Sequence, residues 1–203
     1  MGDHPGRKST ASATGSDRAL SSAVIGAVAG AAGVWAMDQL GWLMLRAENT
    51  PTLARDLHAR QDRTPHTDLS AQVRSVQQSP LVGEGAAGAI RTATQVSGVS
   101  DPDRRPGPGA TIFHFALGML PGAAYGAARR RRPWLSTGCG ALYGLGLFVV
   151  MDEAAAPLTG IASGPHHYPW QAHARGLMAH LVLGLTTETL LRATDRLRRA
   201  GRR

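Results

Sequence analysis

The feature that most constrains this chain of 203 residues is the gathering of its apolar residues into four long blocks. Each block has about the ~20 residues that an α-helix needs to cross the hydrocarbon core of a bilayer. None has the polar stripe of period 3.6 that marks a surface helix of a soluble bundle. The sequence therefore predicts an all-α, polytopic membrane protein, a four-transmembrane-helix bundle, rather than a soluble one. The predicted spans are residues 20–45, 110–128, 134–155 and 174–192.

Polar segments flank and separate the predicted spans. Residues 1–18 are rich in small and polar side chains and predict a disordered tail, which leaves 19–203 as the membrane domain. The segment 46–107 is expected to be polar and to lie on the outer side of the membrane. Within it, 101–109 is rich in Pro and Gly and predicts a loop, and 80–98 suits an interfacial or re-entrant helix.

The first block also has features of a cleaved signal peptide. It follows basic residues and contains small residues typical of a cleavage site at 27–29. Its apolar stretch, however, exceeds the ~7–15 residues usual for such a region and continues through Trp35 and Trp42. The pattern therefore favours a retained span.

The distribution of arginine predicts how the chain is oriented. Residues 129–132 are four consecutive Arg, whereas the connection 156–173 contains no Lys or Arg. Cytoplasmic loops are enriched in Lys and Arg, so the arginine run is expected in the cytoplasm and the other connection outside. Both termini, including the basic tail 193–203, then lie in the cytoplasm, and the chain is a multi-pass protein of the cell inner membrane. The segment 46–107 lies outside despite its eight Arg, because it also has seven acidic residues and long loops translocate largely regardless of charge.

The net charge of +8 has a plain explanation in this topology. The C-terminal arginines and the run Arg129, Arg130, Arg131 and Arg132 are expected to contact the anionic inner leaflet of the lipid bilayer. Nucleic-acid binding is not predicted, because no binding motif or interleaved aromatic residue accompanies the arginines. The sequence does not decide between a homo-oligomer and association with a second membrane protein.

The single cysteine, Cys139, excludes an intramolecular disulfide and a Cys-based zinc site. It falls inside the third predicted span, where a small buried apolar residue is the expected role. No phosphate-binding glycine loop, nucleophile elbow or HExxH motif occurs in the chain. The sequence therefore predicts no catalytic residue, and an enzyme is not expected.

Three of the predicted spans carry glycines spaced four residues apart, which form a smooth ridge along one helix face. Close contact through small residues is what brings helices together in lipid. A composition of 25 Gly is the alternative explanation for this spacing, but its recurrence in three spans favours packing into a compact bundle. These glycines are Gly26 and Gly30, then Gly118, Gly122 and Gly126, and finally Gly140 and Gly144.

Six ionisable residues lie within or at the ends of the predicted spans and form the candidate site. An ionisable group at the centre of a span costs about 2.5–3.5 kcal/mol on insertion scales, so each needs a compensating role. The predicted topology places all of them except Glu188 in the outer half, as an intramembrane polar cluster with His166, His167 and His173 close above it. Glu188 lies near the inner end and is expected to pair with Arg192, four residues later. The six residues are Asp38, His114, Asp152, Glu153, His180 and Glu188.

Such a cluster allows three chemistries. Interhelical hydrogen bonds would lock the bundle. Histidine with a carboxylate would sense pH or relay protons, because His titrates between about pH 5 and 8. The same side chains bind zinc and other divalent ions, although the histidine spacing here matches no standard ligand set. The sequence names no cofactor and no confident metal ligand.

The chain from His114 onward contains short motifs in a defined order. They resemble those of the YagU-like family of bacterial inner-membrane proteins over about 90 residues. The resemblance implies a small polytopic inner-membrane protein and includes His114, Glu153, His180 and Glu188; it implies no reaction, because the family has no assigned biochemical activity. The motifs are H-F at 114–115, A-Y-G at 124–126, P-W at 133–134, D-E at 152–153, P-L-T-G at 157–160, P-W at 169–170, A-H-L-V-L-G at 179–184 and Glu188.

The leading hypothesis is thus an integral inner-membrane protein that responds to pH or couples to protons through its His and carboxylate residues. The alternative is a structural or partner-binding membrane subunit with neither transport nor catalysis. A metal-binding membrane protein is the third hypothesis.

Overall fold

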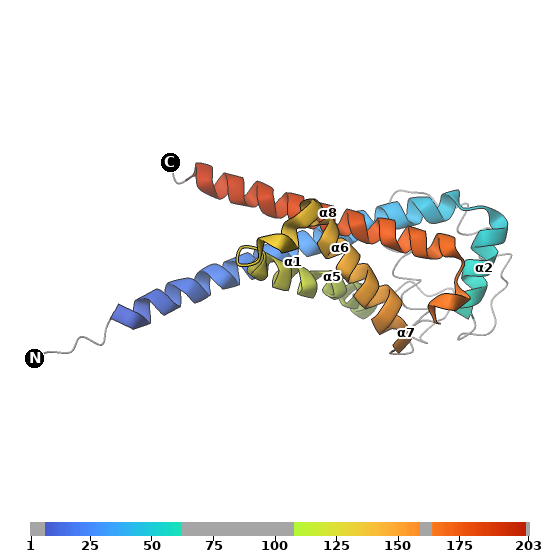
Figure 1. The fold of residues 1–203 in the computed structure, drawn as a ribbon, viewed down its shortest axis with the longest axis horizontal. Coiled ribbons are helices and arrows are strands. Elements are labelled where there is room, and N and C mark those ends of the chain that lie inside the picture. The colour runs from blue at the N-terminus through green and yellow to red at the C-terminus, as the bar shows by residue number, and fades with distance from the viewer. Residues whose placement is uncertain (1–6, 62–107, 159–163, 202–203) are drawn as a thin grey trace, which may run out of the picture.

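Helices account for all the regular structure in residues 7–61, 108–158 and 164–201, which are the residues that the computed structural model describes (Figure 1). The expected all-α class is confirmed for these residues, which include no β-strand. The α-helices are α1 (Arg7–Ala47), α2 (Thr50–Gln61), α5 (Pro108–Ala128), α6 (Ala141–Leu147), α7 (Ala156–Leu158) and α8 (Trp170–Ala200). The 3₁₀-helices are η1 (Pro133–Gly140) and η3 (Pro165–His167), and η2 (Phe148–Ala155) is a π-helix.

The long elements run alternately in opposite directions (Figure 1). Helix α1 packs against both α5 and α8, and α6 packs against α8. The N-terminus and the C-terminus lie at the same end of the molecule, and α2 lies at the opposite end (Figure 1). This up-and-down order is the one expected for short connections between neighbouring antiparallel helices.

The glycine ridges predicted from the sequence form the two closest helix contacts. A Cβ atom on Gly26 would lie 2.2 Å from the carbonyl oxygen of Gly122, so α1 and α5 touch through their backbones. A Cβ on Gly144 would lie 2.2 Å from the carbonyl oxygen of His180, which brings α6 equally close to α8. The packing role expected for these glycines is therefore confirmed.

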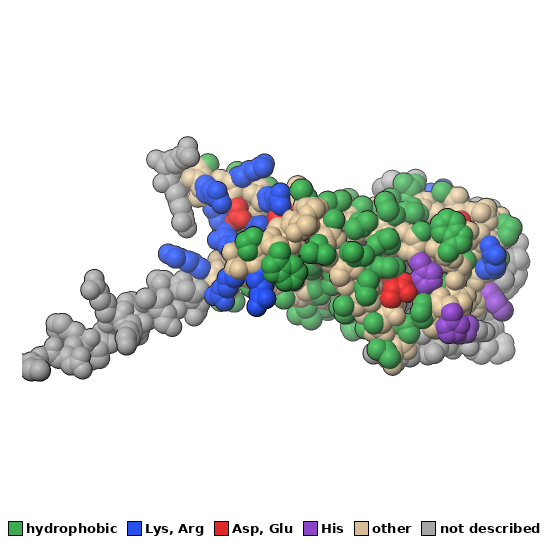
Figure 2. Space-filling model, in the orientation of Figure 1, with side chains coloured by type: hydrophobic (Ala, Val, Ile, Leu, Met, Phe, Trp, Pro, Cys, Tyr) green, Lys and Arg blue, Asp and Glu red, His purple; other side chains and the backbone are tan. Residues whose placement is uncertain are grey.

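The bundle is apolar outside and partly polar inside. Large apolar side chains such as Val28, Ile112 and Leu120 are exposed, whereas Asp38 and Glu188 are buried. Figure 2 shows hydrophobic side chains over the middle of the molecule, with Lys and Arg gathered at the end that holds both termini. A soluble helical protein has the reverse arrangement, with its apolar faces turned inward.

Two helical stretches among the described residues, Asp17–Ala47 and Pro133–Leu158, are long and apolar enough to cross a membrane, and Ile112–Ala128 is a shorter apolar helix. In the most apolar 18 residues of these two stretches only 28% and 22% are buried, whereas the core helix of a soluble protein is mostly buried. The predicted fourth span lies within α8, whose buried face carries ionisable residues.

Two of the predicted boundaries are wrong. Residues 7–18 were expected to be disordered, but α1 begins at Arg7. No proline interrupts the chain between Arg7 and the apolar block, so a helix nucleated in that block extends outward with one added hydrogen bond per residue. The loop expected at 101–109 ends earlier, because α5 begins at Pro108, and proline is well tolerated in the first helical turn. The helix expected at 80–98 lies outside the described residues.

The third predicted span is broken rather than continuous. Residues Thr137, Gly138 and Cys139 have non-helical backbone angles, and Gly138, Cys139 and Gly140 have positive φ values of 62°, 57° and 96°. Glycine adopts this left-handed region without steric cost, which explains why the break falls between two glycines. Cys139 lies within the apolar stretch Pro133–Leu158 as expected, but its side chain is exposed, so the expected burial is wrong.

Candidate functional site

The six predicted polar residues form separate interhelical pairs and one larger network instead of a single cluster. Asp38 pairs with His114, Asp152 with His180, and Glu153 with His173. Glu188 belongs to an arginine network with other partners. Asp38, Asp152 and Glu153 each pair with a histidine on a neighbouring element, whereas Glu188 also pairs within its own helix.

The pair Asp38 and His114 joins α1 to α5. The Nε2 atom of His114 lies 3.1 and 3.0 Å from the two carboxylate oxygens of Asp38. The side chain of Asp38 is only 2% exposed and that of His114 only 12%. A carboxylate this deeply buried needs such a partner, because leaving its charge unpaired away from water is costly.

This pair continues the two glycine ridges. On α1, positions 26, 30, 34 and 38 follow at intervals of four, and on α5 positions 114, 118, 122 and 126 do the same. Gly30 contacts Gly118, and Val34 fills the space beside Gly118, which leaves Asp38 level with His114. Rows of residues at intervals of four interdigitate in the commonest class of helix packing. The shared spacing was the sequence signal that could have identified this pair.

The other two pairs join η2 to α8. The Nδ1 atom of His173 lies 2.6 Å from Oε1 of Glu153, and its Nε2 lies 2.9 Å from the carbonyl oxygen of Pro165. The Nδ1 atom of His180 lies 2.9 Å from the carbonyl oxygen of Gly176 and 3.5 Å from Oδ2 of Asp152. The π-helical winding of η2 brings the consecutive residues Asp152 and Glu153 to two histidines seven positions apart, and short π-helical segments are frequent at functional sites.

The two contacts of His173 favour its charged form. Both ring nitrogens face acceptors, and only an imidazolium can donate from both. Burial by itself lowers the pKa of His173. The hydrogen bonds to Glu153 and Pro165, together with the negative charges of Glu153 and Asp56, outweigh burial and raise this pKa above its ordinary value. His173 therefore holds its proton to a higher pH than a free histidine.

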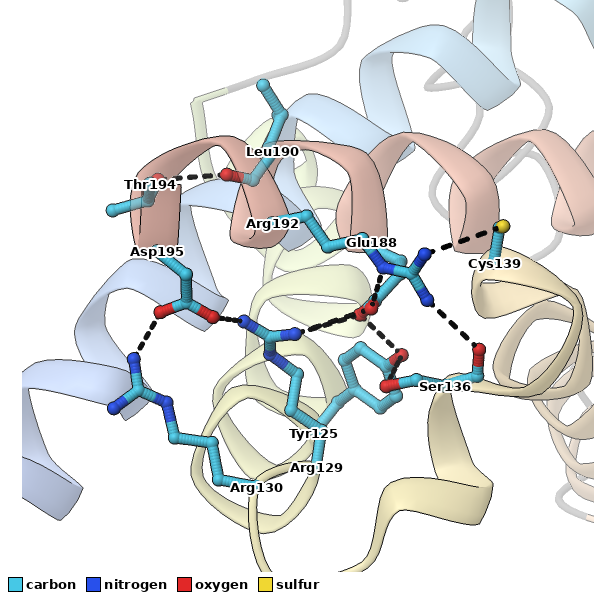
Figure 3. Close-up of polar contacts among 10 residues, drawn as sticks. All are labelled: Tyr125, Arg129, Arg130, Ser136, Cys139, Glu188, Leu190, Arg192, Thr194 and Asp195. Carbon is cyan, nitrogen blue, oxygen red and sulfur yellow. Dashed lines mark hydrogen bonds and ion pairs between the residues drawn. The ribbon is translucent and has the colours of Figure 1, made fainter. Parts of the chain in front are cut away.

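At the opposite end of the bundle, Glu188 accepts hydrogen bonds from three side chains: Tyr125 of α5, Arg129 just after α5, and Arg192 of α8 itself (Figure 3). The hydroxyl of Tyr125 donates to its Oε2 at 2.7 Å, and the Nε of Arg192 donates to its Oε1 at 2.6 Å. Arg129 approaches both oxygens, at 3.3 and 3.4 Å. The side chain of Glu188 is only 1% exposed. The predicted pair with Arg192 is confirmed, whereas the partners Tyr125 and Arg129 were not predicted.

The same network reaches the end of α8 and the break in the third span. Arg129 and Arg130 both pair with Asp195. Arg192 donates to the carbonyl oxygen of Ser136 at 3.4 Å and lies 3.7 Å from the sulfur of Cys139 (Figure 3). Glu188 and Arg192 thus connect α8 to the non-helical segment next to Gly140.

A further set of charges, absent from the sequence-based prediction, fastens α2 to the bundle. Arg175 of α8 pairs with the fully buried Asp56 of α2 and lies 3.5 Å from Glu48. Next to α2, a pocket of about 530 Å³ lies between Arg55 and His58 on one side and His167 on the other. The sequence carries no local signal for a pair separated by 119 positions.

Comparison with known proteins adds no assignment to this site, since no family, curated protein or solved structure matches the chain. Among residues 7–61, 108–158 and 164–201, no three His, Cys, Asp or Glu side chains are grouped so that they could hold a metal ion. The argument for function therefore depends on the paired side chains and on their places in the bundle.

Proposed function

We propose that this chain is a multi-pass inner-membrane protein with four spans and both termini in the cytoplasm. The apolar exterior and the buried ion pairs support this location, because the reverse distribution is typical of soluble proteins. Arginines gather at the end that holds both termini, as expected for a cytoplasmic face (Figure 2). Membership of the YagU-like family, proposed from the sequence motifs alone, agrees with this location.

In this proposal residues 174–192 of α8 form the fourth span despite their ionisable residues. His180 and Glu188 are buried against neighbouring helices and hydrogen-bonded, so neither presents a charge to lipid. Outward-facing positions such as Met178, Leu185 and Leu190 are apolar and exposed. Intramembrane charges in known membrane proteins likewise face the interior of the bundle.

The activity we propose is a pH-dependent change in helix packing at the histidine-rich end. The observation that carries it is that three imidazoles each meet a carboxylate on a different element: once between α1 and α5, and twice between η2 and α8. Loss of a proton from an imidazolium converts an ion pair into a weaker neutral hydrogen bond. Deprotonation would therefore loosen α5 and η2 at this end.

The arginine network at the other end would act as a fixed pivot. Arginine stays charged at every physiological pH, so Arg129 and Arg192 keep their contacts with Glu188 when the pH changes. Protonation would then alter one end of the bundle and leave the other in place.

Distance measurements in a bilayer test this proposal. In a Cys139→Ser background, spin labels at Phe113→Cys and Leu43→Cys report the separation of the exposed surfaces of α5 and α1. We expect the distance distribution to broaden or lengthen between pH 5.5 and 8.5, and Asp38→Asn to abolish this dependence. A control pair at Leu20→Cys and Leu197→Cys, on the arginine side, should not respond to pH.

A structural or partner-binding subunit is the second candidate. It is favoured by the hydrogen bonds that Asp38 and Glu188 already make with side chains of the bundle. Interhelical hydrogen bonds of this kind stabilise a membrane bundle without further activity. The same labels separate the two proposals: pH-independent distances in a protein that still enters the membrane would reject the pH response and favour the structural role.

A further inference from the structure

Three helices converge on a narrow crevice at the end of the molecule that holds both termini. Its walls come from α1, the C-terminal end of α5 with the residues just after it, and the last turns of α8. The polar groups and small residues that line it include Ser22, Gly126, Arg129, Arg130, Asp195 and Arg198.

The charge around this crevice is positive. Arg129 is enclosed and shared between Glu188 and Asp195, whereas Arg130 keeps a side chain that is 53% exposed while it pairs with Asp195. Arg198 lines the crevice as well, and no interaction of its side chain with another described residue is seen. The carboxylate of Asp195 is thus outnumbered by the guanidinium groups around it. An anion bearing several oxygens is the complementary ligand, because guanidinium groups bind phosphate through paired hydrogen bonds.

Exposed apolar side chains stand next in the chain to residues that line the crevice: Leu190 precedes Leu191, and Leu197 precedes Arg198. Leu190 and Leu197 lie seven positions apart on α8 and thus on one face of that helix, and both are exposed. Trp134, which follows the arginine run, is also exposed, and amphipathic rings of this kind favour the depth of lipid headgroups. A ligand that satisfies both features has an anionic head and an apolar tail.

The interior of this crevice, about 10 Å³, has room for about one water molecule at most. We propose that its exposed rim is a binding site for an anionic phospholipid, with the phosphate against Arg130 and Arg198 and an acyl chain along Leu190 and Leu197. Basic pockets between spans on the cytoplasmic side bind such headgroups in other membrane proteins. The proposal rests on the membrane location proposed above but is independent of the pH response at the other end.

Lipid binding to the full-length chain, purified in a neutral detergent, tests the site. Binding of dioleoyl phosphatidylglycerol, measured by native mass spectrometry, should exceed that of dioleoyl phosphatidylcholine. The double variant Arg130→Gln/Arg198→Gln should lose about tenfold or more in phosphatidylglycerol affinity, since two charges near the headgroup are removed. Arg55→Gln, which removes an exposed arginine at the other end, is the matched control and should bind as the wild type does.

Two further measurements keep the outcome decisive. If the double variant does not fold, the single variant Arg198→Gln is used, since it breaks no contact within the described bundle, and it should still bind less. If inorganic phosphate displaces phosphatidylglycerol at comparable concentrations, the site binds free anions and the lipid proposal is wrong. If all variants bind phosphatidylglycerol with the same affinity, the lipid contact is non-specific and the proposal is also wrong. Recovery of the chain in the soluble fraction without detergent would instead reject the membrane location itself.

Discussion

Glu188 is the residue on which the arginine end of the bundle depends. Its carboxylate accepts hydrogen bonds from Tyr125, Arg129 and Arg192, and its side chain is almost fully buried. A buried ion network of this kind contributes little net stability compared with an apolar core, because desolvation offsets the attraction between the charges. Removing the carboxylate of Glu188 has a larger effect, because the mostly enclosed Arg129 is then left with Asp195 alone as its carboxylate partner in the network.

Replacement of Glu188 by Gln should therefore destabilise the protein strongly. We expect a loss of about 3 kcal/mol in the free energy of unfolding, at the lower end of the range for broken buried pairs because Arg192 is partly exposed. Thermal unfolding in detergent measures this loss. The control Tyr125→Phe removes one hydrogen bond and should cost about 1 kcal/mol. A Glu188→Gln variant with the same melting temperature as the wild type would contradict the role given to Glu188.

His173 makes the stability of the histidine end depend on pH. Because its folded pKa is raised, its pair with Glu153 contributes stability that is fully present below the unfolded pKa of about 6.5. That contribution is lost as the pH rises through the higher folded pKa. The difference in melting temperature between wild type and Glu153→Gln should thus be larger at pH 5.5 than at pH 8.5. A difference that grows with pH would have the wrong sign for this pair.

At the scale of the elements, the glycines decide how closely the helices approach. Gly140 combines two constraints, a φ of 96° and a position where a Cβ would lie 2.3 Å from the carbonyl oxygen of Gly184. The contact joins the end of η1 to α8 and sets the direction in which α6 leaves the break. Gly146, six residues later in α6, has nothing within 4 Å of an added Cβ.

The substitution Gly140→Ala should accordingly destabilise the bundle, while Gly146→Ala should not. We expect a loss of about 2–5 kcal/mol for the first, from left-handed strain together with overpacking. The second replaces a helical glycine in open space and should be neutral or stabilising by about 0.5–1 kcal/mol. Denaturant or thermal unfolding of both variants provides the comparison, and equal stabilities would show that the close contact with Gly184 is not rigid.

At the scale of the whole molecule, charge is segregated along the bundle. Arginines gather at the end with both termini, and histidines gather at the other (Figure 2). The two ends are separated by a band of exposed apolar side chains. This polarity predicts which end faces the cytoplasm, and one native residue allows the prediction to be tested, because Cys139 is the only cysteine and is exposed.

A membrane-impermeant maleimide should label Cys139 in inverted inner-membrane vesicles and not in intact spheroplasts. In the variant His166→Cys/Cys139→Ser, which moves the thiol to the exposed η3, the pattern should reverse. Labelling of both positions from the same side would contradict the proposed orientation. Labelled protein found in the soluble fraction instead of the vesicles would contradict the membrane location.

Local patterns in the sequence identified the features that depend on neighbours along the chain. The positions of α1, α5 and α8 follow from continuous apolar blocks, and the contact of Arg192 with Glu188 follows from the spacing of one helical turn. The spacing of Gly118 and Gly122 likewise indicated a face able to meet another helix. These inferences succeed because helical periodicity places such residues together whatever the rest of the chain does.

Only the tertiary structure decided which faces meet. Gly140 meets Gly184 of α8 at close range, and the pairing of Arg175 with Asp56 brings together residues 119 positions apart. The expected single cluster became separate pairs because helix packing gave Asp38, Asp152 and Glu153 different partners. Periodicity shows which residues share a face of one helix, but the contact between two helices depends on their crossing and register, which are set by packing across the whole bundle.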